Sequence, residues 1–120
     1  MPKKILIVDD EEDVITILKK KLEAEGFSVV TAKDGVEGFK QTQAESPDLI
    51  LLDIIMPNKD GFQMLKDLQA DEKLRKIPVI MVTGKAESSS VFNGQYLGAT
   101  DYLIKPVDLQ QLLKYINRYT

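Results

Sequence analysis

Residues 49–53 read Leu-Ile-Leu-Leu-Asp, which is four consecutive apolar residues followed by a carboxylate. Unbroken apolar runs of this length are typical of strands that are buried on both faces, as in a parallel sheet covered by helices on each side. Four further short runs of apolar and β-branched residues occur along the chain, at residues 5–8, 28–32, 79–82 and 102–104. The sequence therefore predicts five strands.

Helical spacing of apolar residues separates and follows these runs. The spacing predicts helices containing Val14/Leu18/Leu22, Val36/Phe39, Phe62/Leu65/Leu68 and Leu109/Leu112/Leu113/Ile116. One more helix, the fourth in chain order, is expected over Ser88 to Leu97, and it should be weak because serine, asparagine and glycine are poor interior helix residues. Five strands alternating with five helices predict an α/β fold built from βαβ units around a parallel sheet.

Local signals predict where three of these helices begin or end. Gly26 follows the first helical pattern, where glycine most easily adopts a left-handed conformation. Ser46-Pro47 is expected to end the second helix, because the residue before proline disfavours helical geometry. Asp108 is placed to cap the last helix.

Length and charge limit the classes of protein to consider. At 120 residues the chain is long enough for one domain with a hydrophobic core, and we expect residues 1–120 to form that single domain. Sixteen Lys and Arg residues against nineteen Asp and Glu residues give a net charge of −3. Such a balance provides no basic field for a phosphate backbone, so direct nucleic-acid binding is disfavoured.

The chain contains no cysteine and no histidine. This excludes disulfides, thiolate nucleophiles, imidazole bases and Ser-His-Asp triads, and leaves carboxylates, lysine, hydroxyls and hard metals for any chemistry. The apolar runs are far shorter than the ~18 residues of a membrane span. The amino-terminal apolar run, residues 5–8, is also too short for a signal peptide. We therefore expect a cytoplasmic protein that does not insert into membranes.

Polar residues follow four of the five predicted strands. In an open parallel sheet, ligands bind outside the carboxyl ends of the strands, so these residues should meet at one edge. They are Asp9-Asp10, Asp53, Thr83-Gly84 and Lys105-Pro106.

Each of these signals has an ordinary structural explanation. The acidic run at residues 9–13 can be a solvated helix start, and Asp53 can be a turn residue. Thr83 can be a strand-end hydroxyl, and Lys105 a surface lysine. Their joint placement at one edge favours a functional site, because the ordinary explanation would be needed four times.

The chemistry of this set indicates phosphoryl transfer. Three carboxylates held together repel unless a cation intervenes, and Mg²⁺ prefers carboxylates, water and phosphate oxygens. A carboxylate can act as a nucleophile toward phosphorus and form an aspartyl-phosphate. Lys105 can neutralise phosphoryl oxygens, and the Thr83 hydroxyl can donate to another.

Four motifs resemble the response-regulator receiver domain of two-component signalling, in particular the single-domain chemotaxis regulators. They are Val8-Asp9-Asp10, Leu52-Asp53-Ile54-Ile55-Met56-Pro57 with Asp60-Gly61, Val82-Thr83-Gly84 and the run from Gly98 to Pro106. They occur in order across essentially the whole chain. The resemblance implies a flavodoxin-like, doubly wound sheet of five parallel strands in the order 2-1-3-4-5, with five helices.

The resemblance also implies roles for individual residues. Asp53 would accept a phosphoryl group from a sensor histidine kinase, a phosphotransfer protein or a small phosphodonor. Mg²⁺ would be held by Asp10 directly, by Asp9 largely through water, by Asp53 and by the backbone carbonyl of Ile55. Thr83 and Lys105 would contact the phosphoryl group.

Signalling would then run through a conformational switch formed by Thr83 and Tyr102. A downstream protein or output domain would bind the face made by the fourth helix, the fifth strand and the last helix, and the chain would be a monomer or a weak phosphorylation-dependent dimer. The Lys105–Pro106 peptide bond is expected to be cis. Such a protein is a signalling phosphoacceptor that assists its own phosphorylation and dephosphorylation, not a conventional enzyme.

Two alternatives stay open on the sequence. One is a degenerate receiver that serves as a fixed adaptor without phosphorylation, which the intact acidic pair, Asp53, Thr83 and Lys105 disfavour. The other is a phosphatase with an aspartyl nucleophile. That class needs a second acid two residues after the nucleophile, where this chain has Ile55.

Overall fold

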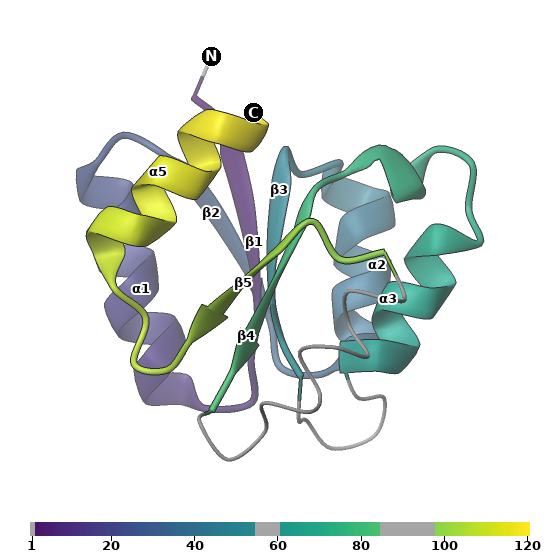
Figure 1. Ribbon diagram of the computed structural model, residues 1–120, viewed down its shortest axis with the longest axis horizontal. Coiled ribbons are helices and arrows are strands. Elements are labelled where there is room, and N and C mark those ends of the chain that lie inside the picture. Colours follow the sequence, from purple (N-terminus) through teal and green to yellow (C-terminus); the bar gives the residue numbers. More distant parts are fainter. Residues whose placement is uncertain (1, 55–60, 85–97) are drawn as a thin grey trace.

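Five parallel strands form one sheet in the order β2-β1-β3-β4-β5 (Figure 1). The computed structural model describes residues 2–54, 61–84 and 98–120, with Thr83 described only by its place in a strand. The strands are β1 (Lys4–Val8), β2 (Ser28–Ala32), β3 (Leu49–Asp53), β4 (Val79–Thr83) and β5 (Asp101–Ile104). The predicted α/β fold and strand order are confirmed.

Strand β3 lies at the centre of the sheet, between β1 and β4, and all five of its residues are buried. Its register pairs Leu52 with Val8 of β1 and Asp53 with Val82 of β4. Continuing the first pairing by one residue places Asp53 beside Asp9. The central strand and its neighbour therefore end together, and each ends in a carboxylate.

The described part of the chain contains four α-helices and one 3-10 turn. They are α1 (Glu12–Ala24), α2 (Gly35–Glu45), α3 (Gly61–Gln69), α5 (Leu109–Tyr119) and the turn η1 (Leu74–Lys76). The helix predicted over Ser88 to Leu97 lies outside the described residues. None of these four helices combines the length and the apolar character needed to cross a membrane.

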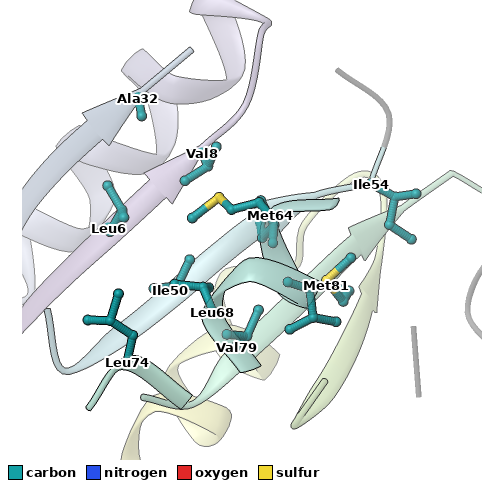
Figure 2. Close-up of a cluster of buried hydrophobic side chains, with 12 residues drawn as sticks. Leu6, Val8, Ala32, Ile50, Ile54, Met64, Leu68, Leu74, Val79 and Met81 are labelled. Atoms are coloured by element: carbon teal, nitrogen blue, oxygen red, sulfur yellow. The ribbon is translucent and has the colours of Figure 1, made fainter. Parts of the chain in front are cut away.

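Helices cover the sheet in two layers, with α1 and α5 on one face and α2 and α3 on the other (Figure 1). Beneath α1 and α5, the buried core is formed by Ile5, Ile7, Ile15, Leu18, Leu22, Leu49, Leu51, Ile80, Val82, Leu103, Leu112 and Ile116. Figure 2 shows the core of the second face, in which Met64 and Leu68 pack on Leu6, Val8, Ile50 and other strand residues. Strand side chains alternate between the two cores, which explains the continuous apolar runs.

Helix α2 is present as predicted, but the two apolar residues that indicated it differ in burial. Val36 does not belong to the inner face of the helix, because 43% of its surface is exposed. The buried residues of the helix are Gly35, Gly38 and Thr42, and Phe39 packs partly against the core. A Cβ atom at Gly38 would lie 2.8 Å from the Met64 sulfur, so a larger residue at this position would require the Met64 side chain to move.

The predicted helix ends are confirmed. Gly26 follows α1 with φ +94°, and Ser46 ends α2 with φ 47°. The Asp108 carboxylate accepts a hydrogen bond from the backbone N–H of Gln110 at the start of α5. The Lys105–Pro106 peptide bond is cis, as expected.

Candidate functional site

Two carboxylates are buried at the carboxyl end of the sheet. Asp53 is the last residue of β3 and is 4% exposed, and Asp9 follows β1 and is 3% exposed. They lie there because the apolar strands that carry them, at the centre of the sheet, end at the same level. Burial of ionised side chains is unfavourable unless partners compensate for the lost hydration.

Lys105 supplies a compensating charge from the loop after β5. Its Nζ lies 3.2 Å from Asp53 Oδ2 and 3.5 Å from Asp9 Oδ2. The same Nζ lies 3.0 Å from Glu11 Oε1. Residues more than forty positions apart in the sequence therefore meet around a single ammonium group.

The turn between β1 and α1 holds Asp9 in place. The Asp9 backbone N–H donates to the carbonyl of Ala32 at the end of β2, with an N–O distance of 3.1 Å. Its Oδ1 atom accepts from the backbone N–H of Glu11 at 2.9 Å. Oδ2 remains directed to Lys105, so the two oxygens of Asp9 have different partners.

The local electrostatics disfavour negative charge on the two buried aspartates. Burial, and then the charge of Asp9, raises the pKa of Asp53 to about 6, although Lys105 opposes this shift. Burial also raises the pKa of Asp9, against the hydrogen bond from Glu11 N–H and the charge of Lys105. Burial alone would lower the pKa of Lys105, but Glu11 and the two aspartates more than offset this and raise it.

The donor atoms at this site suit a hard divalent metal. Asp9, Asp10, Glu11 and Asp53 each offer a carboxylate oxygen, and these oxygens lie within 4.8 Å of one another. The set contains neither nitrogen nor sulfur, and Asp9 and Asp53 are destabilised as anions. Carboxylate oxygens with room for water are what Mg²⁺ prefers, so the residues present fit this ion.

The structure brings together Asp9, Asp53 and Lys105, and it places Asp10, exposed, beside them. Strand β4 ends at Thr83 on the same side of the sheet, next to Ile104 of β5 in the register. The Thr83 side chain and the whole of Ile55 lie outside the described residues. The roles predicted for these two residues are therefore not tested here.

Tyr102 lies in β5 and packs partly against the core beneath α2 and α3. Its hydroxyl oxygen is buried without a hydrogen-bond partner among the residues that the structure describes. Burial, reinforced by the charge of Asp101, raises the pKa of this phenol.

Glu11 is a site residue that the sequence analysis did not single out. It was included in the acidic run at residues 9–13, where a solvated helix start was one explanation. Its carboxylate instead contacts Lys105, which is 94 positions away in the chain. The only signal for this contact in the sequence was its position directly after Asp9-Asp10.

A groove borders the site on the side of α1. It has a volume of about 440 Å³ and lies between α1 and the loop after β5. Its lining is mainly apolar, with Val14, Ile17, Leu18, Pro106 and Val107, and Lys105 and Lys21 contribute the charged groups. Lys105 thus belongs both to this groove and to the carboxylate site.

A sequence profile of the response regulator receiver domain matches residues 5–117. This chain belongs to the receiver domain family. Protein PilH of Pseudomonas aeruginosa is 43% identical over 114 residues, which cover 95% of this chain and 94% of PilH. The receiver fold is also that of the chemotaxis protein CheY4 of Vibrio cholerae, with a TM-score of 0.92, 30% identity and complete coverage of both chains.

A second relative is longer than this receiver domain. The alkaline phosphatase synthesis transcriptional regulatory protein PhoP of Bacillus subtilis is 44% identical over 106 residues. These residues cover 88% of this chain but 43% of PhoP, so the receiver domain spans less than half of that protein. Family membership confirms the predicted resemblance and places the chain in two-component signalling, where receiver domains are signalling proteins and not conventional enzymes.

Proposed function

We propose that this receiver domain is a phosphorylation-dependent switch in which Asp53 accepts the phosphoryl group. The observation that supports this most directly is the setting of Asp53. Its carboxylate is buried beside Asp9, has a raised pKa, and lies 3.2 Å from Lys105 Nζ. Crowded anions next to a fixed ammonium are suited to binding a cation together with a phosphoryl group.

In the proposed reaction, an Asp53 carboxylate oxygen attacks phosphorus in line with the leaving group. The new O–P bond forms as the bond from phosphorus to the donor breaks. The electron pair of that bond leaves with the imidazole nitrogen of a phosphohistidine donor, or with the carboxylate oxygen of acetate when acetyl phosphate is the donor. Neutral pH is above the Asp53 pKa of about 6, so most Asp53 side chains are ionised and can act as the nucleophile. Lys105 offsets charge on the phosphoryl oxygens, and the Thr83 hydroxyl donates to another of them.

Mg²⁺ is part of this proposal. Asp10 and Asp53 would hold it directly, with Asp9 acting largely through water and the backbone carbonyl of Ile55 as a further ligand. When bound, the ion supplies positive charge that offsets the carboxylates and the incoming phosphoryl oxygens. The buried pair Asp9 and Asp53 supports this assignment, since their raised pKa values show that the site disfavours its own negative charge.

Intact-protein mass spectrometry after incubation with acetyl phosphate and Mg²⁺ tests the phosphoacceptor. We expect a mass gain of one phosphoryl group in the native protein, and none in Asp53→Asn. Asp48→Asn is a matched control, because Asp48 is an exposed carboxylate just before the other end of β3. Phosphorylation of Asp53→Asn would contradict the proposal, and an unmodified native protein would favour the fixed adaptor.

We further propose that the phosphodonor protein, a sensor histidine kinase or a phosphotransfer protein, docks on the groove beside α1. The groove is mainly apolar, and it shares Lys105 with the site, so a partner seated there can reach Asp53. Ile17, on its rim, is 52% exposed, which is unfavourable for a large apolar side chain in water.

A comparison of two phosphodonors, the kinase and acetyl phosphate, separates docking of the kinase from the chemical step. Ile17→Ser should slow phosphorylation by the kinase and leave phosphorylation by acetyl phosphate unchanged. Val36→Ser serves as the control, because Val36 is also apolar and exposed but belongs to α2 and lies outside the groove. Equal rates of transfer from the kinase to both variants would disprove this docking site.

For the output, we propose that phosphorylation moves Thr83 and Tyr102 and changes the face formed by residues 88–97, β5 and α5. The buried position of the Tyr102 hydroxyl, which has no hydrogen-bond partner among the described residues, supports an inward starting position for the switch. On the same strand, Ile104 is 54% exposed, as an apolar contact for a downstream protein or output domain would be. Hydrogen exchange of β5, with and without beryllofluoride, tests this, and equal protection in both states would contradict it.

The remaining parts of the proposal concern the whole chain. We propose that residues 1–120 act as one receiver domain in the cytoplasm, as a monomer or a weak dimer that phosphorylation favours. The match to residues 5–117 supports the domain extent. Sedimentation with and without beryllofluoride measures the oligomeric state.

A further inference from the structure

Glu11 occupies an unusual position between a helix and the site. It is the N-cap residue of α1, yet its side chain makes no capping hydrogen bond. Instead its Oε1 atom accepts a hydrogen bond from Lys105 Nζ at 3.0 Å, the shortest of the three ion pairs that this ammonium makes among the described residues. The backbone N–H of Glu11 donates to Asp9 Oδ1, which fixes where this side chain starts.

Carboxylates surround Lys105 Nζ, which donates hydrogen bonds to Glu11 and Asp53 and lies 3.5 Å from Asp9 Oδ2 as an ion pair. An ammonium group has three donors, and three carboxylates lie around it, those of Glu11, Asp53 and Asp9. Phosphorylation converts the Asp53 carboxylate into an acyl phosphate whose oxygens need the same ammonium, so Glu11 and Asp9 compete with the phosphoryl group for its donors.

Exposure identifies which carboxylate can leave. The side chains of Asp9 and Asp53 are 4% and 5% exposed, whereas that of Glu11 is 59% exposed. Glu11 can therefore exchange Lys105 for water at little cost, while the buried aspartates cannot.

We propose that Glu11 is a positioning residue that competes with the phosphoryl group for Lys105 and so favours the unphosphorylated state. The inference rests on the function proposed above and concerns the regulation of the same site. Because exposed ion pairs contribute modestly, we expect removal of Glu11 to tighten binding of a phosphoryl analogue about two- to fivefold.

Three variants separate this competition from simple charge repulsion. Glu11→Gln removes the charge, and Glu11→Asp keeps the charge but shortens the side chain by one methylene. Glu12→Gln is the matched control, since Glu12 is the next residue, is exposed and pairs with Lys33 at 2.8 Å instead of Lys105. Circular dichroism establishes that each variant folds.

The measured quantity is the apparent Kd for beryllofluoride at saturating Mg²⁺, obtained by calorimetry. We expect tighter binding by Glu11→Gln and by Glu11→Asp, and no change in Glu12→Gln. Native affinity in Glu11→Asp together with tighter binding by Glu12→Gln would show that repulsion acts instead, and would overturn the proposal. Weaker binding of both Mg²⁺ and beryllofluoride by Glu11→Gln would overturn it too, because Glu11 would then be a metal ligand.

The ammonium itself gives a readout independent of activity. In protein labelled with ¹⁵N-lysine, the Lys105 Nζ signal should differ between native protein and Glu11→Gln without ligand, and should coincide once beryllofluoride is bound. A difference that persists in the bound state would contradict the exchange of partners. If native protein failed to bind beryllofluoride, the proposed function would fail as well, whereas native binding unchanged in Glu11→Gln would refute only this inference.

Discussion

Charged side chains are arranged differently at the two ends of the sheet. At the amino end, the backbone N–H of Lys4 donates to Asp48 Oδ2 at 2.7 Å, and Lys4 Nζ pairs with Glu45 Oε1 at 2.9 Å. The Asp48 backbone N–H donates to the carbonyl of Lys4 at 2.8 Å. At the carboxyl end, four carboxylates gather near one another, and three of them pair with Lys105.

The difference shows which end contributes stability and which carries an electrostatic cost. Charges at the amino end are partly exposed and have partners, so they tie β1 to the α2–β3 connection. At the carboxyl end, burial raises the pKa of both Asp9 and Asp53, so ionisation destabilises the fold there. A bound cation would relieve this unfavourable charge, which has no counterpart at the amino end.

Replacing one aspartate at each end should give effects of opposite sign. Because the pKa of Asp53 is raised to about 6, we expect Asp53→Asn to increase the free energy of unfolding, without Mg²⁺ and near pH 7.5, by on the order of 2 kcal/mol. Asp48→Asn should decrease it by about 1 kcal/mol, because a charged acceptor of a backbone N–H is lost. Urea unfolding measures both, and a destabilised Asp53→Asn would show that the carboxyl end carries no such electrostatic cost.

Magnesium should act on the carboxyl end alone. At ten times its dissociation constant, a ligand specific to the folded state adds about 1.4 kcal/mol to stability. We expect this gain in native protein and in Asp48→Asn, and its loss in Asp53→Asn, in melting curves with and without Mg²⁺. An unchanged midpoint for the native protein at saturating metal would be evidence against a preformed site.

Acidification should also distinguish the two ends. The pKa of Asp53 is about 6 in the folded protein, whereas its ordinary value, expected in the unfolded chain, is 3.8. The folded protein therefore binds this proton more tightly. The contribution of Asp53 to stability rises as pH falls through 6, and it is complete below about 4. Between pH 7.5 and 5, without Mg²⁺, native protein should gain about 1 kcal/mol relative to Asp53→Asn. Parallel stability curves for the two proteins would contradict this expectation.

The smallest effect is expected at the amino end. The Lys4–Glu45 pair is about one-third exposed on each side, so Glu45→Gln should reduce stability by about 0.5 kcal/mol or less. Salt should screen the difference, and Mg²⁺ affinity should stay unchanged. A change in Mg²⁺ affinity would mean that the two ends are coupled through the sheet, which would break the comparison.

Strands were the most predictable part of this fold. Continuous apolar runs such as residues 49–52 can belong to few other structures in a short chain, and the strand bounds differ from the runs by at most one residue at either end. Asp9, Asp53 and Lys105 could be grouped beforehand because the ends of parallel strands meet at one edge. Residue type and position sufficed for that step.

What could not be predicted depends on packing and on side-chain direction. Gly38 and Thr42 of α2 are buried whereas Val36 is exposed, and Met64 of α3 fills the space that a larger side chain at Gly38 would need. That requirement is set by a residue on another helix. The contact of Glu11 with Lys105 likewise depends on how two flexible side chains meet, which no local pattern specifies.

The close approach of Gly61 to the end of β3 has a consequence for how this domain tolerates mutation. Gly61 donates its N–H to the Ile54 carbonyl at 2.8 Å, and a Cβ atom there would lie 2.8 Å from Ile54 Cα, a backbone atom that cannot step aside. Gly26 has nothing within 4 Å, and its only restriction is φ +94°. In a library that varies every position, position 26 should admit asparagine at modest cost, whereas position 61 should retain glycine alone. Design of altered receivers can therefore begin at the α1–β2 turn, and it has to leave the start of α3 untouched.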